Sequence, residues 1–301
     1  MIRVVTTPVR PRVHITGPVP AEVREELASS FEVLDGPAGA DGILSLLTTR
    51  VDAALLESAG PQLRVVANYA VGTDNVDLAA VRERGIVLTN TPDVLTDATA
   101  ELAIALTLSL LRRVAEGDRF VRARKEWTFG LEFMLGRSLR GARFLVVGPG
   151  RIGRATALLA AALGAVTDFA GRGDDLLPLL KEADVVSLHV PLRDETRHLI
   201  DANTLAAMKP SAVLVNTARG AVVDEQALVD ALRAGTIAGA GLDVFENEPS
   251  VPAELLALDN VVLTPHVGSA TWQTRQAMAD LAFGNLQAHF AGRPLLSPVP
   301  A

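Results

Sequence analysis

Cysteine is absent from this sequence, which excludes disulfide bonds, catalytic thiols and thiolate metal sites. No His, Asp or Glu cluster has metal-ligand spacing, so no metal is expected. The longest apolar helical stretch, Leu102–Leu111, is far shorter than a membrane span, and residues 1–17 lack the continuous apolar segment of a secretory signal. The net charge is −7 and basic residues form no run, which argues against nucleic acid as a partner. These absences predict a soluble, cytoplasmic protein that binds neither nucleic acid nor membrane.

The pattern along the chain predicts an α/β fold, with two Rossmann-like, doubly wound parallel-sheet domains and a cleft between them. With 301 residues, 49% of them hydrophobic, the chain can bury a large core. Short apolar runs alternate with helix-like segments, which is typical of parallel sheets covered on both faces. Expected strands are Arg12–Thr16, Phe31–Leu34, Gly42–Leu47 and Leu63–Asn68, then Phe144–Val147, Val185–Val190, Ala212–Asn216, Ala238–Asp243 and Val261–Thr264. A helix over Thr96–Arg113 connects the halves, and a last helix over Thr271–Phe290 is expected to return to the first half.

A glycine-rich turn follows the run Phe144–Val147, and a helix-compatible segment follows the turn. In this strand, turn and helix order, Gly148 permits a tight turn, Gly150 lets a pyrophosphate approach the backbone, and Gly153 lets the helix pack closely on the strand. The free N–H groups at the helix start then face the phosphates. The segment therefore predicts a dinucleotide site.

The end of the next strand indicates which dinucleotide is preferred. An NAD site of this kind usually has an acidic residue there, for the ribose 2′-hydroxyl, but this chain has Gly171 and Arg172. A small residue followed by a guanidinium leaves room for a 2′-phosphate and pairs with its charge, which favours NADP(H). Asp168 should point to the opposite face of the strand. NAD(H) use is possible if the following loop brings Asp174 or Asp175 back toward this position.

Three polar residues lie at or just after the ends of later strands: Arg219, Glu248 and His266. Strand ends beside a dinucleotide are where reacting groups belong. Hydride transfer to a 2-keto acid needs a cation to hold the carboxylate and polarise the carbonyl, which Arg219 supplies. It also needs a proton donor, which His266 supplies, with Glu248 beside it to keep the ring protonated and oriented.

The segments NTARG, LDVFENEP and PHVGSAT, together with the turn GPGRIG, resemble the signatures of the D-isomer-specific 2-hydroxyacid dehydrogenases. The resemblance covers residues 40–290. Within that family, the segments ANYAVG, TPDVLTDATAE and GDRFVR look most like those of glyoxylate and hydroxypyruvate reductases, which often favour NADPH. The resemblance implies reduction of a small 2-keto acid to the D-2-hydroxy acid, with His266 as the proton donor.

The resemblance also implies residue roles and a domain division. It makes Arg219, Glu248 and His266 catalytic, and places the carboxylate of the substrate at Arg219 and at the backbone N–H groups of Val71 and Gly72. The implied cofactor contacts are Gly148, Gly150, Arg151, Ile152, Gly153, Gly171, Arg172, Thr217, Ala218, Asp243, Gly268 and Thr99. The implied domains are a flavodoxin-like substrate domain, residues 1–97 plus 271–301, and a dinucleotide-binding domain, residues 98–270. A homodimer formed through the cofactor domains is implied as well.

Two departures from the family pattern affect the cofactor domain. Pro149 stands where a larger apolar residue is usual, and it removes one N–H from the turn. Only residues 173–183 separate Arg172 from Asp184, where the family usually has an additional helix and strand. We therefore expect this sheet either to have lost its third strand, which normally backs the adenosine pocket, or to have compressed it.

Other functions remain open from the sequence. One is a different 2-hydroxyacid dehydrogenase, such as a 2-ketogluconate reductase or a phosphoglycerate dehydrogenase without a regulatory domain. Formate dehydrogenase is disfavoured because its relatives have Gln in place of Glu248. A third is a non-catalytic nucleotide-sensing protein, which the Arg219, Glu248 and His266 set argues against. The other histidines, His14, His189, His198 and His289, are expected to be structural or solvated.

Overall fold

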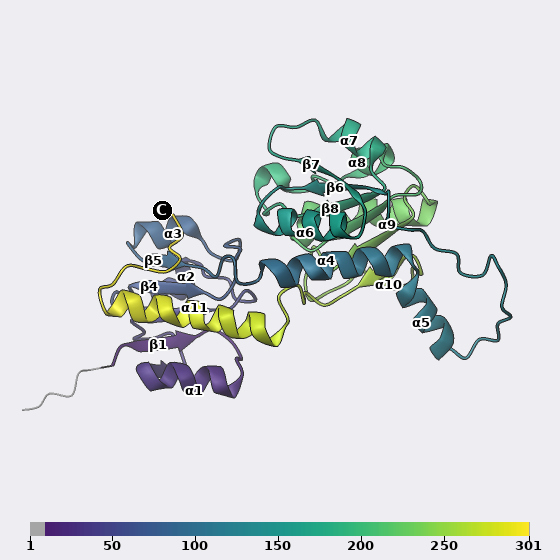
Figure 1. Ribbon diagram of the computed structural model, residues 1–301. Helices are drawn as coiled ribbons and strands as arrows, with labels where there is room; N and C mark the ends of the chain where they lie inside the picture. Colours follow the sequence, from purple (N-terminus) through teal and green to yellow (C-terminus); the bar gives the residue numbers. More distant parts are fainter. Residues whose placement is uncertain (1–9, 301) are drawn as a thin grey trace, which may run out of the picture. The chain divides into compact units, whose positions relative to one another are not determined.

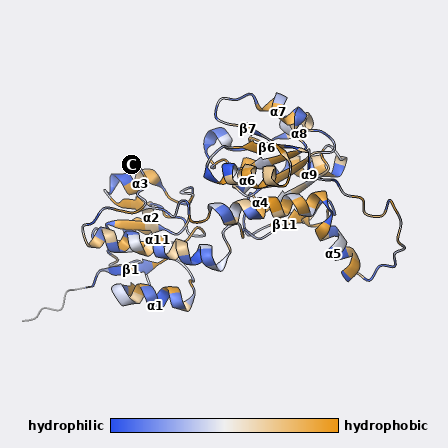
Figure 2. Ribbon diagram, in the orientation of Figure 1, coloured by the Kyte–Doolittle hydropathy of each residue, from blue (hydrophilic) through white to orange (hydrophobic). Residues whose placement is uncertain are grey.

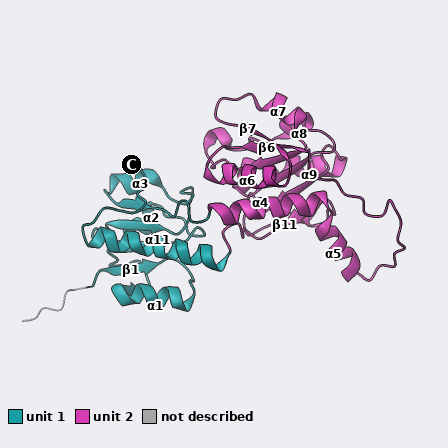
Figure 3. Cartoon of the chain, in the orientation of Figure 1, with its two compact units in different colours: residues 1–95, 271–301 teal, residues 96–270 magenta. Residues whose placement is uncertain are grey.

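The computed structural model describes residues 10–300 and contains two compact units (Figures 1 and 3). One unit comprises the described residues up to Leu95 together with those from Thr271 onward, and the other runs from Thr96 to Ala270. The first boundary lies two residues before the position expected from the sequence. Residues 1–9, which form half of the segment considered for a secretory signal, lie outside the described part of the chain.

The first unit is built on a parallel sheet of five strands in the order β2-β1-β3-β4-β5. The strands are β1 (Arg12–Ile15), β2 (Glu32–Leu34), β3 (Gly42–Ser45), β4 (Val65–Asn68) and β5 (Val87–Thr89), and the helices are α1 (Ala21–Ser30), α2 (Ala53–Ala59), α3 (Leu78–Glu83) and α11 (Trp272–Phe290). Neighbouring residues of a strand face opposite sides of the sheet. Val65 accordingly packs with the core that includes α1 and α11, and Val66 packs with the core of α2 and α3. The last helix thus returns to the first sheet.

The second unit contains a parallel sheet of six strands in the order β11-β10-β9-β8-β6-β7. The strands are β6 (Arg143–Val147), β7 (Val166–Ala170), β8 (Val185–Leu188), β9 (Val213–Asn216), β10 (Gly239–Leu242) and β11 (Val261–Leu263). One face packs on α4 (Thr96–Leu111) and α6 (Arg151–Ala162) through residues such as Phe144 and Val146. The other packs on α7 (Leu176–Glu182), α8 (Ala202–Ala207) and α9 (Glu225–Ala234) through Leu145 and Val147. The strands around β6 are coloured as hydrophobic in Figure 2, as expected for a sheet covered on both faces.

Strand β7 is the edge of this sheet. The chain leaves β7 through residues 171–175, forms α7, and enters β8, which pairs with β6 on its other side. No strand lies between β7 and β8 in this described stretch. The sheet therefore has no strand beyond β7, the place where the family usually has the strand that backs the adenosine pocket.

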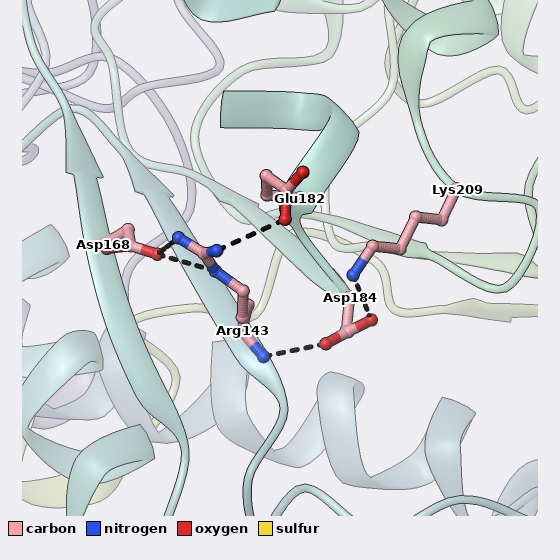
Figure 4. A network of polar contacts seen from close by, with 5 residues as sticks. All are labelled: Arg143, Asp168, Glu182, Asp184 and Lys209. Carbon is pink, nitrogen blue, oxygen red and sulfur yellow. Dashed lines mark hydrogen bonds and ion pairs between the residues drawn. The ribbon is translucent and has the colours of Figure 1, made fainter. Parts of the chain in front are cut away.

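A charged network joins this edge strand to its neighbours at the amino ends of the strands (Figure 4). The guanidinium of Arg143 donates to Asp168 of β7 at 3.0 Å and to Glu182 of α7 at 3.3 Å. Asp184 accepts from the Arg143 N–H and from Lys209 Nζ, both at 2.9 Å. Burial alone would raise the pKa of Asp184, but these two donors and nearby positive charges lower it. An inward-held charge such as Asp168 also discourages pairing of another chain with the edge strand.

Several elements were not anticipated from the sequence. These are β5, the helix α5 (Val114–Arg122) and the extended segment 123–136 after it, which projects away from the second sheet (Figure 1). The helix expected over Thr96–Arg113 ends at Leu111, and Arg113 takes a left-handed conformation with φ 54°. The proline-rich C-terminal segment is bound to β5, where the Val299 N–H donates to Leu88 O at 2.9 Å. Within residues 10–300, no helix combines the length and the apolar character needed to cross a membrane.

Candidate active site

The glycine turn between β6 and α6 combines two crowded positions with one open position. Gly148 has φ 98°, and a Cβ there would lie 2.7 Å from His189 O. A Cβ on Gly153 would lie 2.2 Å from Gly148 O, so only glycine allows α6 to pack this closely on β6. A Cβ on Gly150 would meet nothing within 4 Å. The fold itself thus demands glycine at 148 and 153, whereas at 150 glycine leaves space beside the start of α6.

The helix α6 begins at Arg151 and Ile152 with Gly150 as its N-cap, and no side chain caps it. A helix start of this kind, without a side-chain cap, is a typical binding site for an anion. Pro149 contributes no N–H to this turn, and its ring lies 3.6 Å from where a Cβ on Gly171 would stand.

The loop after β7 folds back on the strand end. The Gly171 N–H donates to Asp174 Oδ2 at 2.7 Å, so a carboxylate lies beside the position where the sequence suggested a 2′-phosphate. Asp175 is occupied as the N-cap of α7, where it accepts from the Leu177 N–H. Arg172 is exposed, and Asp168, within β7, bonds to Arg143 at the start of β6.

The turn after β9 carries Arg219 on a fixed backbone. The buried Asn216 donates from Nδ2 to Arg219 O at 2.9 Å and accepts the Ala218 N–H at 3.0 Å. Arg219 Nη1 donates to Ala218 O at 2.7 Å. A Cβ on Gly220 would stand 1.9 Å from Phe245 C. The residue after the arginine must therefore be glycine for the two turns to pack together.

Two features of this unit fit a bound dinucleotide. The Thr217 hydroxyl is buried and has no hydrogen-bond partner among the described residues, which is costly unless a ligand supplies one. The space at Gly150 lies at a helix start whose N–H groups have no side-chain cap. Both features lie at the carboxyl ends of parallel strands, where open α/β sheets bind their ligands.

The loop that carries His266 is organised by Asp243 at the end of β10. This buried carboxylate accepts from Thr264 Oγ1 at 2.7 Å and from the N–H groups of Val267 and Gly268 at 2.8 Å. The His266 N–H donates to Asp243 O at 2.8 Å, and His266 has φ 54°. Asp243, implied above as a cofactor contact, thus holds the histidine loop with both carboxylate oxygens.

The predicted catalytic residues are brought together by the loops after β9, β10 and β11. His266 Nδ1 and Glu248 Oε2 are 2.7 Å apart, and Glu248 Oε1 accepts the Phe245 N–H at 3.0 Å. Burial alone would raise the pKa of Glu248, but these bonds and the charges of His266 and Arg219 lower it, so the carboxylate is ionised at neutral pH. With Nδ1 bound to Glu248, the Nε2 atom of His266 is the ring nitrogen left for a substrate.

Thr99 lies near this loop within the same unit: a Cβ on Gly268 would stand 3.5 Å from Thr99 Cγ2. Thr99 is buried in the first turn of α4. The same Cβ would lie 3.2 Å from Asp243 Oδ2. Any residue other than glycine at position 268 would therefore press on both Thr99 and Asp243. The helix start and the histidine loop are packed as one assembly.

The remaining histidines have protein partners, and one pair was missed from the sequence. His198 Nε2 and Glu246 Oε1 are 2.8 Å apart, although 48 positions separate them along the chain, so no local pattern signals the contact. His189 Nε2 lies 2.8 Å from Ser187 Oγ, and burial lowers the pKa of this histidine to about 4. His14 Nδ1 contacts Leu34 O, and burial lowers the pKa of His289.

The other predicted substrate residues, Val71 and Gly72, belong to the first unit, in the loop after β4. Their carbonyls accept from Asn90 Nδ2 at 2.9 Å and from Asn68 Nδ2 at 2.8 Å. In the described part of the chain their N–H groups donate to no protein acceptor. Residues 10–300 contain no group of three or more His, Asp or Glu side chains suited to a metal ion.

The parallel sheet with its glycine turn and its assembled polar loops defines the second unit as the nucleotide-binding part of an NAD(P)-dependent oxidoreductase. Residues 104–268 match the family described as D-isomer specific 2-hydroxyacid dehydrogenase, NAD binding domain. The chain belongs to the D-isomer-specific 2-hydroxyacid dehydrogenase family.

Proteins similar to this one match it over nearly its whole length. The glyoxylate reductase of Thermococcus litoralis is 43% identical, over 94% of this chain and 95% of the relative. That of Pyrococcus furiosus is 45% identical, over 94% and 93%. The crystal structure of an NADPH-dependent glyoxylate/hydroxypyruvate reductase from Sinorhizobium meliloti, in complex with NADP and malonate, is 39% identical, with a TM-score of 0.87 over 96% of this chain and 97% of that one.

Proposed function

We propose that this protein reduces glyoxylate or hydroxypyruvate to the D-2-hydroxy acid, using a nicotinamide dinucleotide. The observation that carries the proposal is the His266–Glu248 hydrogen bond of 2.7 Å in the same unit as Arg219, because a proton donor and a carboxylate anchor are what reduction of a 2-keto acid needs. The names of the relatives agree with this substrate class. A binding protein has no use for a proton donor.

The chain's own residues divide the chemistry. Arg219 holds the carboxylate of the substrate and polarises its carbonyl, and the N–H groups of Val71 and Gly72 also bind the carboxylate. His266 gives a proton from Nε2 to the oxygen that becomes the hydroxyl. Glu248 fixes the orientation of the ring through Nδ1. The bound dinucleotide supplies the hydride to the substrate carbon.

The residues proposed to hold that dinucleotide surround the features that fit it. Gly148, Gly150, Arg151, Ile152 and Gly153 form the pyrophosphate site, Gly171 and Arg172 the ribose site, and Thr217, Ala218, Asp243, Gly268 and Thr99 the nicotinamide side. The unpartnered hydroxyl of Thr217 and the open space at Gly150 support the assignment. Asp243 takes part by holding the histidine loop in place.

We propose NADP(H) as the preferred cofactor, with NAD(H) also used. The exposed guanidinium of Arg172 supports the preference, since it suits a 2′-phosphate, and the Sinorhizobium relative is named as NADPH-dependent. Asp174 acts in the opposite direction, because its carboxylate at Gly171 repels a 2′-phosphate and suits a 2′-hydroxyl. The two residues together give a moderate preference.

A homodimer in the cytoplasm completes the proposal. The segment 123–136 exposes large apolar side chains, with Phe129 at 81% and Leu131 at 88% of full exposure. A projecting segment of this kind is typical of an interface between subunits. We name it the apolar arm, and a second copy of the chain is its proposed partner.

A substrate panel tests the function. Oxidation of NADPH and NADH is followed with glyoxylate, hydroxypyruvate, 2-ketogluconate and phosphohydroxypyruvate, and cofactor affinity is measured by calorimetry. The proposal expects glyoxylate or hydroxypyruvate to have the highest kcat/KM. Highest activity on either of the other two acids would move the protein to another enzyme of the family. Cofactor binding without turnover of any acid would make it a nucleotide sensor.

A further inference from the structure

The loop after β4 has an unusual backbone arrangement at Ala70, Val71 and Gly72. Their three consecutive carbonyls all accept hydrogen bonds from the protein: Ala70 O from the Thr91 N–H at 2.9 Å, Val71 O from Asn90 Nδ2 at 2.9 Å and Gly72 O from Asn68 Nδ2 at 2.8 Å. Thr91 and Asn90 directly follow β5, and Asn68 ends β4. In an extended strand, successive carbonyls point to opposite sides. Here the successive carbonyls of Ala70 and Val71 both accept from residues that directly follow β5.

Fixing a carbonyl also fixes the N–H of the next residue. The peptide unit is planar and trans, so the C=O of one residue and the N–H of the next point in opposite directions. The bonds to Ala70 O, Val71 O and Gly72 O therefore orient the N–H groups of Val71, Gly72 and Thr73 away from Thr91, Asn90 and Asn68, respectively. Within residues 10–300, none of these three N–H groups donates to a protein acceptor.

Consecutive N–H groups turned to one side form a concave anion site, often called a nest. The loop thus has three oriented donors, one more than the resemblance assigned. Unpaired backbone donors are expensive unless a ligand or water satisfies them. A carboxylate offers acceptor positions for all three.

The two asparagines are themselves supported by the structure around them. Asn68 is fully buried, and its Oδ1 accepts from Ser45 Oγ at 2.9 Å and Asn75 Nδ2 at 3.1 Å, so Nδ2 must face Gly72 O. The backbone of Asn90 is bound on both sides by Ser297 of the C-terminal segment, whose O accepts the Asn90 N–H at 3.2 Å and whose hydroxyl donates to Asn90 O at 2.6 Å. The Asn68 amide is thus held by its own side-chain bonds, and the Asn90 amide is carried on a backbone that Ser297 holds in place.

We propose that Asn90 and Asn68 are positioning residues for the substrate carboxylate, acting by fixing the two peptide units that carry the Gly72 and Thr73 N–H groups, so that these groups face the carboxylate beside the Val71 N–H. This inference rests on the proposed function, and it adds Thr73 as a third donor. The asparagines touch no substrate. They keep the nest formed before binding, which lowers the ordering cost of capturing a small acid.

Asn90→Ala is the test variant, because Asn90 is only half-buried and its loss leaves the core intact. We expect the KM for glyoxylate, and the Kd of malonate for the NADP-loaded protein, to rise about tenfold, since an oriented bond to a charged group is weakened. The kcat and the Kd of NADPH should change less than twofold. Asn90→Asp, which turns an acceptor toward Val71 O, should weaken acid binding further.

Gln62→Ala is the matched control. Gln62 is another side-chain amide of the first unit that donates to backbone carbonyls, including Ala40 O at 3.0 Å, but it lies outside the loop. Its KM should stay at the wild-type value even if its thermal stability falls. Asn68→Ala is measured alongside, with the Tm separating a misfolded protein from a weakened nest.

The outcomes separate this inference from the proposed function. Turnover by the wild type with unchanged KM and malonate Kd in Asn90→Ala would overturn the positioning role alone. Malonate binding that weakens in Asn90→Ala, in a wild type that turns over none of the keto acids, would uphold the nest and overturn the reductase. A wild type that neither binds malonate nor reduces a keto acid would overturn both.

Discussion

Three carboxylates near the strand ends make different contacts, although all three are simply acidic residues in the sequence. Glu248 contacts the ring of His266, Asp243 holds the backbone that presents the ring, and Asp174 caps the Gly171 N–H. The first was predicted from its motif. The return of Asp174 toward Gly171 was left open as an alternative from the sequence. The role of Asp243 depends on bonds between residues 24 and 25 positions apart, which no local pattern encodes.

Asp174→Ala should shift the cofactor preference further toward NADPH. Removing the carboxylate relieves its repulsion of a 2′-phosphate, so we expect the ratio of kcat/KM for NADPH to that for NADH to rise roughly fivefold, as for an exposed charge pair. Arg172→Ala should lower the ratio by a similar factor. Asp175→Ala is the control, because Asp175 only caps α7. An unchanged ratio in both Asp174→Ala and Arg172→Ala would show that neither residue sets the preference.

Among the secondary-structure elements, most of the fold was predictable and the exceptions have physical reasons. Buried parallel strands are continuous apolar runs, so β6, β8, β9 and β10 stand out in the sequence, and so does the glycine turn before α6. Helix α5 has no buried residue and residues 123–136 form no helix or strand, so the buried apolar runs that indicate the other elements are missing there. The missing strand after β7 was predictable because residues 173–183 are too few for a further helix and strand.

Two glycines of one turn should respond differently to the same substitution. Gly153→Ala places a Cβ 2.2 Å from Gly148 O, so we expect a loss of roughly 2 kcal/mol or more in unfolding free energy. Gly150→Ala meets no protein atom within 4 Å and should leave the Tm unchanged while raising the Kd of NADPH at least tenfold, because the methyl group blocks the pyrophosphate. Thermal melts and cofactor titration of both variants are the measurement. Unchanged NADPH affinity in Gly150→Ala would remove the pyrophosphate from this turn.

His189, which directly follows β8, should make stability depend on pH. The folded pKa is about 4, below the ordinary value of 6.5, because burial disfavours the charged ring. The unfolded chain therefore binds the proton first, and stability falls as pH decreases from about 6.5 to about 4, by on the order of 3 kcal/mol. Urea unfolding gives the free energy of unfolding near neutral pH and at about pH 4.5. The difference between these two free energies should be smaller for His189→Gln than for the wild type. The control His14→Gln should keep the wild-type difference; equal differences in all three proteins would contradict the assignment.

At the scale of the whole molecule, the sequence predicted two parallel-sheet domains and the grouping of Arg219, Glu248 and His266. It did not predict the supports of that group: Asn216 under Arg219, the Phe245 N–H on Glu248, or the asparagines under the Val71 loop. These supports are side chain to backbone bonds. They form wherever the fold brings a strand end to a turn, and residue types such as asparagine recur in so many turns that their presence alone is uninformative.

The apolar arm should control assembly. Replacing Phe129 and Leu131 by glutamate adds charge to side chains that are exposed in the single chain, so the fold should persist while a dimer dissociates to a monomer. Light scattering after size exclusion measures the mass. Leu158→Glu is the matched control, since Leu158 is 72% exposed on α6 and lies outside the arm. A wild type that is monomeric, or a dimer that survives both arm substitutions, would count against the proposed interface.

The measurement that tests the account most directly is glyoxylate-dependent NADPH oxidation by the wild type and by His266→Ala, with the Kd of NADPH measured for both. We expect the wild type to turn over and the variant to lose at least about a hundredfold in kcat, the usual contribution of a positioned general acid. The NADPH Kd should be the same in both proteins. A variant as active as the wild type, or a wild type that binds NADPH and reduces no 2-keto acid, would contradict the assignment of His266 as the proton donor of a 2-keto acid reductase.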